Sequence, residues 1–203
     1  MIGQRIVREA LSRGHGVTVV VRDLTKVGDP HERMTVVEGD VLDPAIGSTL
    51  GSTDVVISAV GTARAEHPDY SLYRRAAEAL VSALRALPDE APRLIVVGGV
   101  GSLRDESGEL LLARVPAERL PEHEGQQAAL DFYRTVSDVR WTYLSPPARI
   151  APGERRGAYR SGADELVVDD SGESSISMED DAVAVVDEAE RPEHVGRRFT
   201  VAY

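Results

Sequence analysis

The 203-residue sequence contains no cysteine. Disulfide bonds, thiolate nucleophiles and thiolate metal sites are therefore excluded. Lys26 is its only lysine, so nearly all of its basic side chains are arginines. No charged leader with an apolar core opens the chain, and no apolar run approaches the ~18 residues of a membrane helix. These absences predict a cytoplasmic location.

Acidic residues outnumber basic residues, 34 to 23, which gives the chain a formal net charge of −11. This charge excludes nucleic acid and anionic membranes as expected partners, although a local basic pocket for one phosphate remains compatible with it. A content of 42% hydrophobic and 28% charged residues is ordinary for a globular protein. We expect a single domain over residues 1–203 with a small-molecule partner. The sequence carries no signal for an oligomeric state.

The stretch from Met1 to Arg22 has the pattern around which the rest of the chain is organised. Gly3 opens an amphipathic helix whose polar face carries arginines and Glu9, and Gly14 ends it. Residues 17–21 form a β-branched run that suits a strand buried on both faces. Glycine, helix, buried strand and a charged residue at the strand tip match the second half of a dinucleotide-binding βαβ unit.

The first half of that unit, a strand and two earlier glycines, is not in the sequence. In a sheet of strand order 3-2-1-4-5-6 the absent strand would lie between residues 17–21 and 54–60. We therefore expect a central gap, low stability and weak NADPH binding for the chain as it stands. An upstream reading frame that encodes an apolar strand and two glycines would make Met1 an internal methionine.

The remaining chain alternates strand and helix patterns, which predicts an α/β fold: a doubly wound, Rossmann-like parallel sheet with helices on both faces. The expected strands are residues 34–38, 54–60, 93–97, 140–144 and 198–201. The expected helices are residues 43–50, 70–87 (followed by Pro88), 122–136 and 179–190. An irregular segment, 103–121, is expected over the site. From about 149 to 178 the composition predicts a small substrate-side lid, with a polar strand near 174–177.

Several short motifs occur in the order and spacing found in one protein family. They are Ile2-Gly3, Val21-Arg22-Asp23, Gly39-Asp40-Val41, Ser58-Ala59-Val60-Gly61, Val97-Gly98-Gly99, Trp141-Thr142-Tyr143-Leu144-Ser145-Pro146, Ile176-Ser177-Met178-Glu179-Asp180-Asp181-Ala182 and Arg197-Arg198-Phe199-Thr200-Val201. Together they resemble the atypical short-chain dehydrogenase/reductases of the NAD(P)-binding Rossmann, epimerase/dehydratase-like superfamily. The subgroup that the chain resembles comprises the NAD(P)H-flavin reductases similar to flavin/biliverdin-IXβ reductase. The resemblance runs the whole length of the chain.

The resemblance implies a site for NADP(H) in preference to NAD(H). Gly3 would be the last glycine of the turn that faces the pyrophosphate. Arg22 stands where NAD-specific sites carry an acid, and its guanidinium would pair with a 2′-phosphate. Thr25 and Lys26 would add phosphate contacts. The alternative for Arg22 is a solvated arginine that Asp23 neutralises.

Further positions follow the later strands. Asp40 and Val41 would contact the adenine, although Asp40 also suits an ordinary turn before a helix. The other implied cofactor-binding residues are Ala59, Val60 and Gly61 beneath the adenine ribose, Gly98 after the strand 93–97, and Ser145, Pro146, Pro147 and Ala148 beside the nicotinamide. A proline pair that simply ends a strand is the competing interpretation of Pro146 and Pro147.

The larger dehydrogenase family uses a tyrosine and a lysine four residues apart, because the ammonium lowers the pKa of the phenol. No tyrosine here has that partner, so the mechanism is excluded. The similar flavin reductases also lack the pair and act chiefly by holding nicotinamide against a planar acceptor. Ser102 matches a serine that lies near the nicotinamide in the similar flavin reductases, and it is our one candidate catalytic residue. A loop serine that caps a turn is the alternative.

Other chemistries have weaker support. No Gly-x-Ser-x-Gly elbow is present, which disfavours a hydrolase of that kind. The histidines lack ligand spacing, so we expect no metal site; they are His15, His31, His67, His123 and His194. The carboxylate clusters 164–165, 169–170 and 179–181 are expected to be solvated, and the cluster 179–181 also suits a helix N-terminus, where negative charge is favoured.

Two functions therefore remain. The first is an oxidoreductase that transfers hydride from NADPH to a flavin or another small planar acceptor. The second is a non-catalytic NADP(H)-sensing regulatory protein of the same fold. A sugar-nucleotide epimerase or dehydratase comes third, because the tyrosine and lysine pair is missing.

Overall fold

The computed structural model describes residues 1–62, 68–87 and 90–203. His67 and Pro88, which entered the sequence interpretation, lie outside the described residues. The helices are α1 (Ile2–Ser12), α2 (Ile46–Leu50), α3 (Leu72–Arg85), α4 (Leu120–Tyr133) and α5 (Met178–Glu190), with short 3-10 helices η1 (Leu24–Lys26), η2 (Val100–Ser102) and η3 (Leu111–Arg114). The strands are β1 (Val17–Val21), β2 (Met34–Glu38), β3 (Val55–Ser58), β4 (Arg93–Val97), β5 (Trp141–Ser145), β6 (Arg149–Ala151), β7 (Arg160–Gly162), β8 (Ser175–Ser177) and β9 (Arg197–Ala202).

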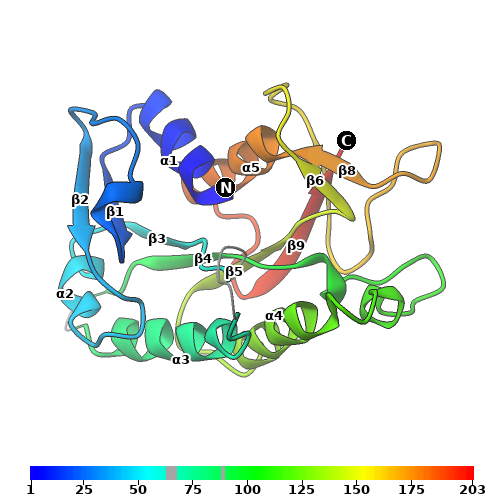
Figure 1. The fold of residues 1–203 in the computed structure, drawn as a ribbon, viewed down its shortest axis with the longest axis horizontal. Helices are drawn as coiled ribbons and strands as arrows, with labels where there is room; N and C mark the ends of the chain where they lie inside the picture. The colour runs from blue at the N-terminus through cyan, green and yellow to red at the C-terminus, as the bar shows by residue number, and fades with distance from the viewer. Residues whose placement is uncertain (63–67, 88–89) are drawn as a thin grey trace.

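The expected α/β architecture is confirmed. Strands β3, β4, β5 and β9 pair in parallel, and β7 adds to β9 in the antiparallel direction. Helices α3 and α4 cover one face of this sheet, and α1 and α5 cover the other (Figure 1). The predicted helix and strand positions agree with the structure to within a few residues.

Alternation along the central strands divides the core into two layers. On β4, Leu94 and Val96 point to the layer of α3 and α4, whereas Ile95 points to the layer of α1 and α5. On β5, Trp141 and Tyr143 face the first layer and Leu144 faces the second. This period of two is what a strand covered on both faces requires.

The sheet is interrupted at the expected place. Strands β1 and β2 form a separate parallel pair, which is not joined to β3. The absent strand of the 3-2-1-4-5-6 order would lie between these two pieces, so the predicted central gap is confirmed. Helix α1 bridges the pieces, because Ile6 and Ala10 belong to a core layer that includes Val17 of β1 and Val55 of β3.

The gap corrects one expectation about burial. We expected residues 17–21 to be buried on both faces, yet every residue of β1 is half-buried or exposed. The first three residues of β3 are also only half-buried, whereas all of β5 is buried. A β-branched strand becomes fully buried only when neighbouring strands complete the layer around it.

Candidate functional site

The predicted cofactor residues follow the carboxyl ends of parallel strands, which is where open α/β sheets bind ligands. Arg22 follows β1, Asp40 follows β2, Ala59 follows β3 and Gly98 follows β4, while Ser145 ends β5. Two contacts of α1 bring the separate pieces together. Gln4 Nε2 donates to the carbonyl oxygen of Lys26 at 3.4 Å, and a Cβ on Gly3 would lie 3.4 Å from the Cβ of Ala59.

The N-terminus of α1 suits a phosphate group. Among the residues that the structure describes, no side-chain hydrogen bond caps this helix end, and its first turn carries no acidic residue. The backbone N–H groups of a first helical turn lack partners within the helix and attract anions. A Cβ on Gly3 would be in ordinary van der Waals contact with Ala59, so the role of Gly3 as the last glycine of the fingerprint stays a prediction. The start of α1 therefore fits the pyrophosphate of a dinucleotide.

Arg22 is exposed at the tip of β1. Within the described part of the chain its guanidinium has neither an ion pair nor a hydrogen bond, and Asp23 is turned to other partners. Asp23 Oδ1 accepts from the backbone N–H and the hydroxyl of Thr25 at 3.0 and 2.5 Å. Asp23 Oδ2 lies 3.1 Å from Lys26 Nζ. The Thr25 hydroxyl is the main reason that the pKa of Asp23 lies below its usual range.

These contacts separate the three predicted phosphate residues. Arg22 is available to pair with a 2′-phosphate, because the neutralisation by Asp23 considered above does not occur. Thr25 and Lys26 are already bound to Asp23, so they would have to exchange that partner for a phosphate. A free guanidinium at the tip of β1 is compatible with a 2′-phosphate, and the contact of Arg22 with NADP(H) stays a prediction.

Asp40 has the turn contact that its alternative interpretation predicts. Its Oδ1 accepts from the backbone N–H of Leu42 at 2.9 Å, and its carbonyl oxygen accepts from Asp43 N at 2.9 Å. Val41 is half-buried and packs against the core layer of α3 and α4. Contacts of Asp40 and Val41 with an adenine stay a prediction.

Ala59, Val60 and Gly61 are half-buried at the end of β3. The nearest atom to a Cβ on Gly61 would be Tyr73 Oη, at 4.0 Å. Tyr73 Oη donates to Glu122 Oε1 at 3.0 Å. Burial, and then the Glu122 carboxylate, raise the pKa of Tyr73. A neighbouring carboxylate raises the pKa of a phenol, whereas the lysine of the missing pair would lower it. Tyr73 therefore does not replace that pair.

Gly98 has a structural reason to be glycine. A Cβ there would lie 1.9 Å from Cε1 of the Tyr143 ring, so the ring leaves no room for a side chain. At β5, Ser145, Pro146 and Pro147 are buried, and Ala148 is exposed. The structure therefore places these residues at the same edge as Gly98, and their contact with a nicotinamide stays a prediction.

Ser102 is only 4% exposed, and its hydroxyl is fully engaged. It donates to the carbonyl oxygen of Gly99 at 3.1 Å, and Ser145 Oγ lies 3.0 Å away. Arg198 Nη1 donates to Ser102 Oγ at 3.1 Å and also to the Ser102 carbonyl oxygen. These contacts favour the alternative role, a serine that stabilises the turn after β4.

Arg198 is a site residue that the sequence reasoning missed. This arginine of β9 is 5% exposed and joins η2 to Asp164 through a second hydrogen bond. Burial lowers its pKa from the ordinary arginine value. The sequence signal for Arg198 is an arginine placed directly before the apolar residues of a predicted strand, and in the structure this stretch of β9 is buried throughout. Arg198 fixes the loop that carries Gly98 and Ser102.

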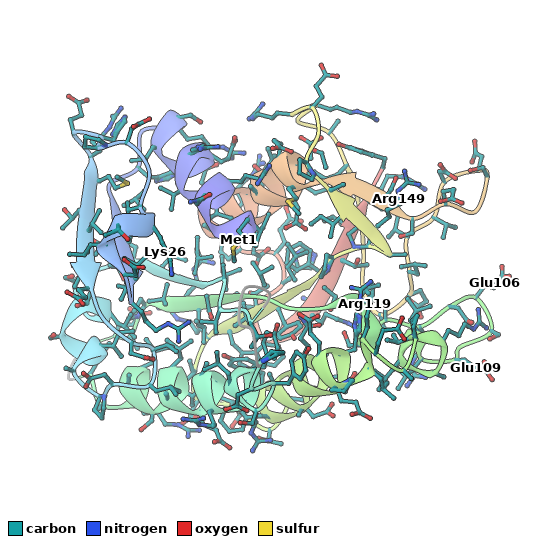
Figure 2. All side chains as sticks on the ribbon, viewed as in Figure 1. Met1, Lys26, Glu106, Glu109, Arg119 and Arg149 are labelled. Carbon is teal, nitrogen blue, oxygen red and sulfur yellow. The ribbon has the colours of Figure 1, made fainter. Side chains whose placement is uncertain are left out.

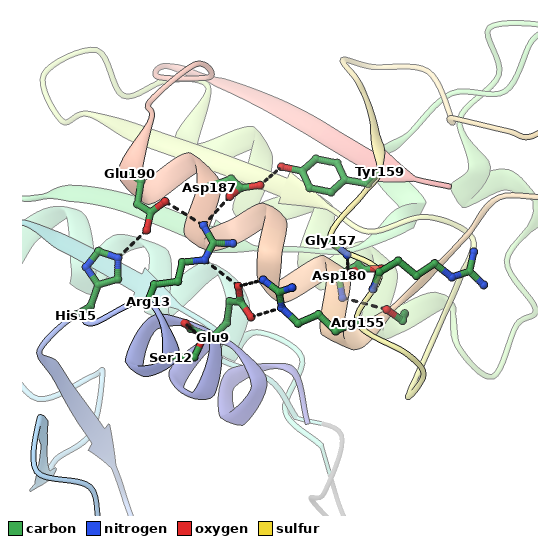
Figure 3. A network of polar contacts seen from close by, with 12 residues as sticks. Glu9, Ser12, Arg13, His15, Arg155, Gly157, Tyr159, Asp180, Asp187 and Glu190 are labelled. Carbon is green, nitrogen blue, oxygen red and sulfur yellow. Dashed lines mark hydrogen bonds and ion pairs between the residues drawn. The ribbon is translucent and has the colours of Figure 1, made fainter.

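A second polar network joins α1 to the segment after β6 (Figure 3). Glu9 accepts two hydrogen bonds from Arg155, at 2.8 and 2.7 Å, and one from Arg13 at 2.8 Å. Arg13 also donates to Asp187 and Glu190 of α5 at 2.6 and 2.9 Å. Glu9 was assigned to the polar face of its helix, but it is 6% exposed. The network therefore joins the predicted lid to α1, the helix that is expected to follow the pyrophosphate-binding turn.

The acidic cluster at the start of α5 corrects another expectation. Asp180 and Asp181 were expected to be solvated, yet both are fully buried. Asp180 accepts from the backbone N–H groups of Arg156 and Gly157 at 3.0 and 2.8 Å. Neither carboxylate oxygen of Asp181 has a hydrogen-bond partner among the residues described. Burial raises the pKa of Asp181 to about 7.

Comparisons with known proteins identify the family of the chain. Residues 1–192 match the model of a family described as NAD(P)H-binding. The Bacillus subtilis (strain 168) protein YwnB is 38% identical, over 98% of this chain and 92% of its own length. A crystal structure of a Burkholderia pseudomallei protein, named as a candidate exported protein, is 38% identical with a TM-score of 0.86, over 100% of this chain and 95% of that one.

A third relative is a candidate NADH-flavin reductase from Streptococcus pneumoniae TIGR4. It is 32% identical with a TM-score of 0.86, over 99% of this chain and 93% of that one. Among the described helices none is long and apolar enough to cross a membrane. The cytoplasmic location stays a prediction. The family match and these relatives, together with the strand-end geometry, show that the chain belongs to the NAD(P)H-binding family.

Proposed function

We propose that the chain is an NADPH-dependent reductase that transfers hydride to a flavin or another small planar acceptor. The observation that carries the choice of cofactor is the unpaired guanidinium of Arg22 at the tip of β1, beside an Asp23 that is bound to Thr25 and Lys26. The name of the Streptococcus relative supports the flavin. A more distant relative from Veillonella parvula, 20% identical, was crystallised with NADP.

Bound NADPH supplies a hydride, and the acceptor takes the accompanying proton from water. The residues of the chain bind the cofactor and orient it toward the acceptor. The first turn of α1 would hold the pyrophosphate, Arg22 would hold the 2′-phosphate, and the loop after β4 would border the nicotinamide. Arg198 and Ser102 keep that loop in place. Rate enhancement then comes chiefly from proximity, because no acid and base pair is positioned to add to it.

One observation favours the second function, an NADP(H) sensor without turnover. The hydroxyl of Ser102, our one candidate catalytic group, is held by Gly99, Ser145 and Arg198. A protein that only binds the cofactor needs no free polar group beside the nicotinamide. The partner of such a sensor would read the state of the lid.

The two functions are separated by NADPH oxidation, followed by absorbance, with free flavin and a panel of quinones as acceptors. The chain is assayed as it stands and with a short apolar strand fused ahead of Met1, so that weak binding is not mistaken for lack of activity. A reductase oxidises NADPH only when an acceptor is present. Tight NADPH binding without turnover over the whole panel would contradict the reductase and support the sensor.

A further inference from the structure

A cleft of about 260 Å³ opens in the lid, on the side of the β6–β8 pair that faces away from the core. We call it the lid cleft. Its polar lining comes from Arg149 of β6, Arg156, Glu154, Ser175, Ser177 and Tyr203. Ile150 and Ile176, the alternate residues of the two strands, belong to the core layer of α1 and α5, and of the two Ile176 also borders the cleft. The pairing of β6 with β8 therefore fixes which side chains line the cleft.

The two arginines of the lid cleft lack acidic partners. Arg149, the first residue of β6, is exposed (Figure 2), and no carboxylate of the described chain lies within ion-pair distance of it or of Arg156. The guanidinium of Arg156 stacks over the ring of Tyr203, 4.1 Å from its centroid. The neighbouring lid arginines differ, because Arg155 is bound to Glu9 and Arg160 donates to backbone carbonyls. Two unpaired guanidiniums in one cleft are unexpected in a chain with a net charge of −11.

The acidic groups near the cleft are already occupied. Glu179 forms an ion pair with Arg5 at 2.6 Å and accepts from the backbone N–H of Gly153 at 2.8 Å. Asp180 accepts from the hydroxyl of Tyr203 at 2.7 Å, in addition to the backbone groups described above. Glu154 is the exception, since it is exposed and lines the cleft. The donors of Arg149 and Arg156 are therefore available to an anion from outside.

The lid cleft also adjoins the predicted acceptor site along the chain. Arg149 directly follows Ala148, the last of the residues expected beside the nicotinamide, and consecutive Cα atoms are ~3.8 Å apart. A guanidinium offers a planar set of donors that matches a phosphate or a carboxylate. Tyr203 keeps the second guanidinium in a fixed orientation through the stacking contact.

We propose that the lid cleft is an anion subsite, in which Arg149 and Arg156 bind the phosphate or carboxylate carried by the acceptor. This assignment rests on the proposed reductase function, because it names the class of acceptor: planar compounds with an acidic side group. It gives the lid a role in choosing among flavins, which share one ring system and differ in their side chain.

The test compares flavins that share the ring. FMN carries a phosphate, a carboxymethylflavin carries a carboxylate, and riboflavin carries neither. Binding is measured by the quenching of flavin fluorescence without NADPH, so the result does not depend on turnover. We expect FMN or the carboxymethylflavin to bind about tenfold more tightly than riboflavin, and the tighter of the two identifies the acidic group.

The variants Arg149→Gln and Arg156→Gln should each weaken that binding about threefold to tenfold and leave riboflavin unchanged. Glu154→Gln should strengthen it, because a like charge is removed. The matched control is Arg8→Gln, which removes an exposed arginine of α1 with no ion pair in the described chain. Thermal melts check that all four variants fold.

Three results would overturn the anion subsite. They are equal affinity for all three flavins, equal losses for FMN and riboflavin in the arginine variants, and the same loss in Arg8→Gln. Failure of the reductase proposal looks different: the flavins would bind with the expected order while NADPH oxidation stayed at the background rate.

Discussion

Replacing Glu9 by glutamine tests how strongly the network of Figure 3 holds the lid to α1. The substitution keeps the size of the side chain and removes its charge. Two hydrogen bonds from Arg155 and one from Arg13 then lose an anionic acceptor. Hydrogen bonds to charged groups contribute ~1.5–3 kcal/mol when buried, but much less when one partner is hydrated.

The solvent exposure of Arg155 and Arg13 determines how much free energy of unfolding Glu9→Gln is expected to lose. The Arg155 side chain is 51% exposed and can return to water, so its share is discounted. Arg13 is 19% exposed but keeps Asp187 and Glu190, so no buried charge is left unpaired. We therefore expect Glu9→Gln to lower the free energy of unfolding by about 1–3 kcal/mol, below the ~3–5 kcal/mol of an orphaned buried charge.

The assay is urea unfolding at pH 7, with Glu78→Gln as the matched control. Glu78 pairs with Arg74 one helical turn away on an exposed face, and such pairs contribute only ~0.3–0.5 kcal/mol. Equal losses in the two variants would refute the reasoning about burial. A loss above ~5 kcal/mol would refute the reasoning that Arg13 keeps its other partners.

The effect should also depend on pH. The hydrogen bond from Arg155 is the main reason that the pKa of Glu9 lies below its ordinary value. Its stabilisation is therefore complete above the unfolded value of ~4.3 and is lost as the pH falls through the lower folded value. The difference in stability between wild type and Glu9→Gln should therefore shrink as the pH falls below ~4.3, and a difference that stays constant on acidification would contradict the assignment.

Three further predictions concern the buried acid, the loop serine and the gap. Asp181 has a folded pKa of about 7 against ~3.9 unfolded, so the free-energy cost of its buried charge grows as the pH rises from about 4 to 7. In urea unfolding, Asp181→Asn should be more stable than wild type by about 2–4 kcal/mol at pH 8 and equally stable at pH 4. No gain in stability at pH 8 would contradict this. Ser102→Ala should lower kcat/KM less than about tenfold if the hydroxyl only stabilises the turn, whereas a loss of 10²–10⁴ in the same steady-state assay would restore its catalytic role. A short apolar strand and glycine turn fused ahead of Met1 should raise Tm by roughly 5–10 °C by pairing with β1 and β3, and a Gly/Ser extension of equal length that raises Tm as much would refute insertion into the gap.

Local pattern was enough to predict most elements of the fold. The β-branched run at 93–97, the largely aromatic and apolar run at 140–144 and the amphipathic face of α3 are each signals within one segment. The interruption of the sheet was also predictable, because the strand order of the fold says which neighbours β1 requires. The degree of burial of β1 was not, since it depends on a strand outside the segment.

The polar networks could not be predicted from the sequence, because their members are far apart along it. Glu9 and Arg155 are separated by 146 residues, and Ser102 and Arg198 by 96. No periodicity links such pairs, and each side chain alone resembles a solvated surface residue. Asp181 was assigned to a solvated helix start for the same reason, although the packing of α5 buries it.

The most direct test of NADP(H) binding at this edge is a calorimetric titration of NADPH and NADH into the chain fused to the apolar strand, and into its Arg22→Gln variant. We expect NADPH to bind about tenfold more tightly than NADH, and the variant to lose that preference while its affinity for NADH stays the same. Equal affinity for the two cofactors, or an unchanged preference in Arg22→Gln, would contradict the assignment of Arg22 to the 2′-phosphate. Failure of the fused chain to bind either cofactor would contradict the site itself.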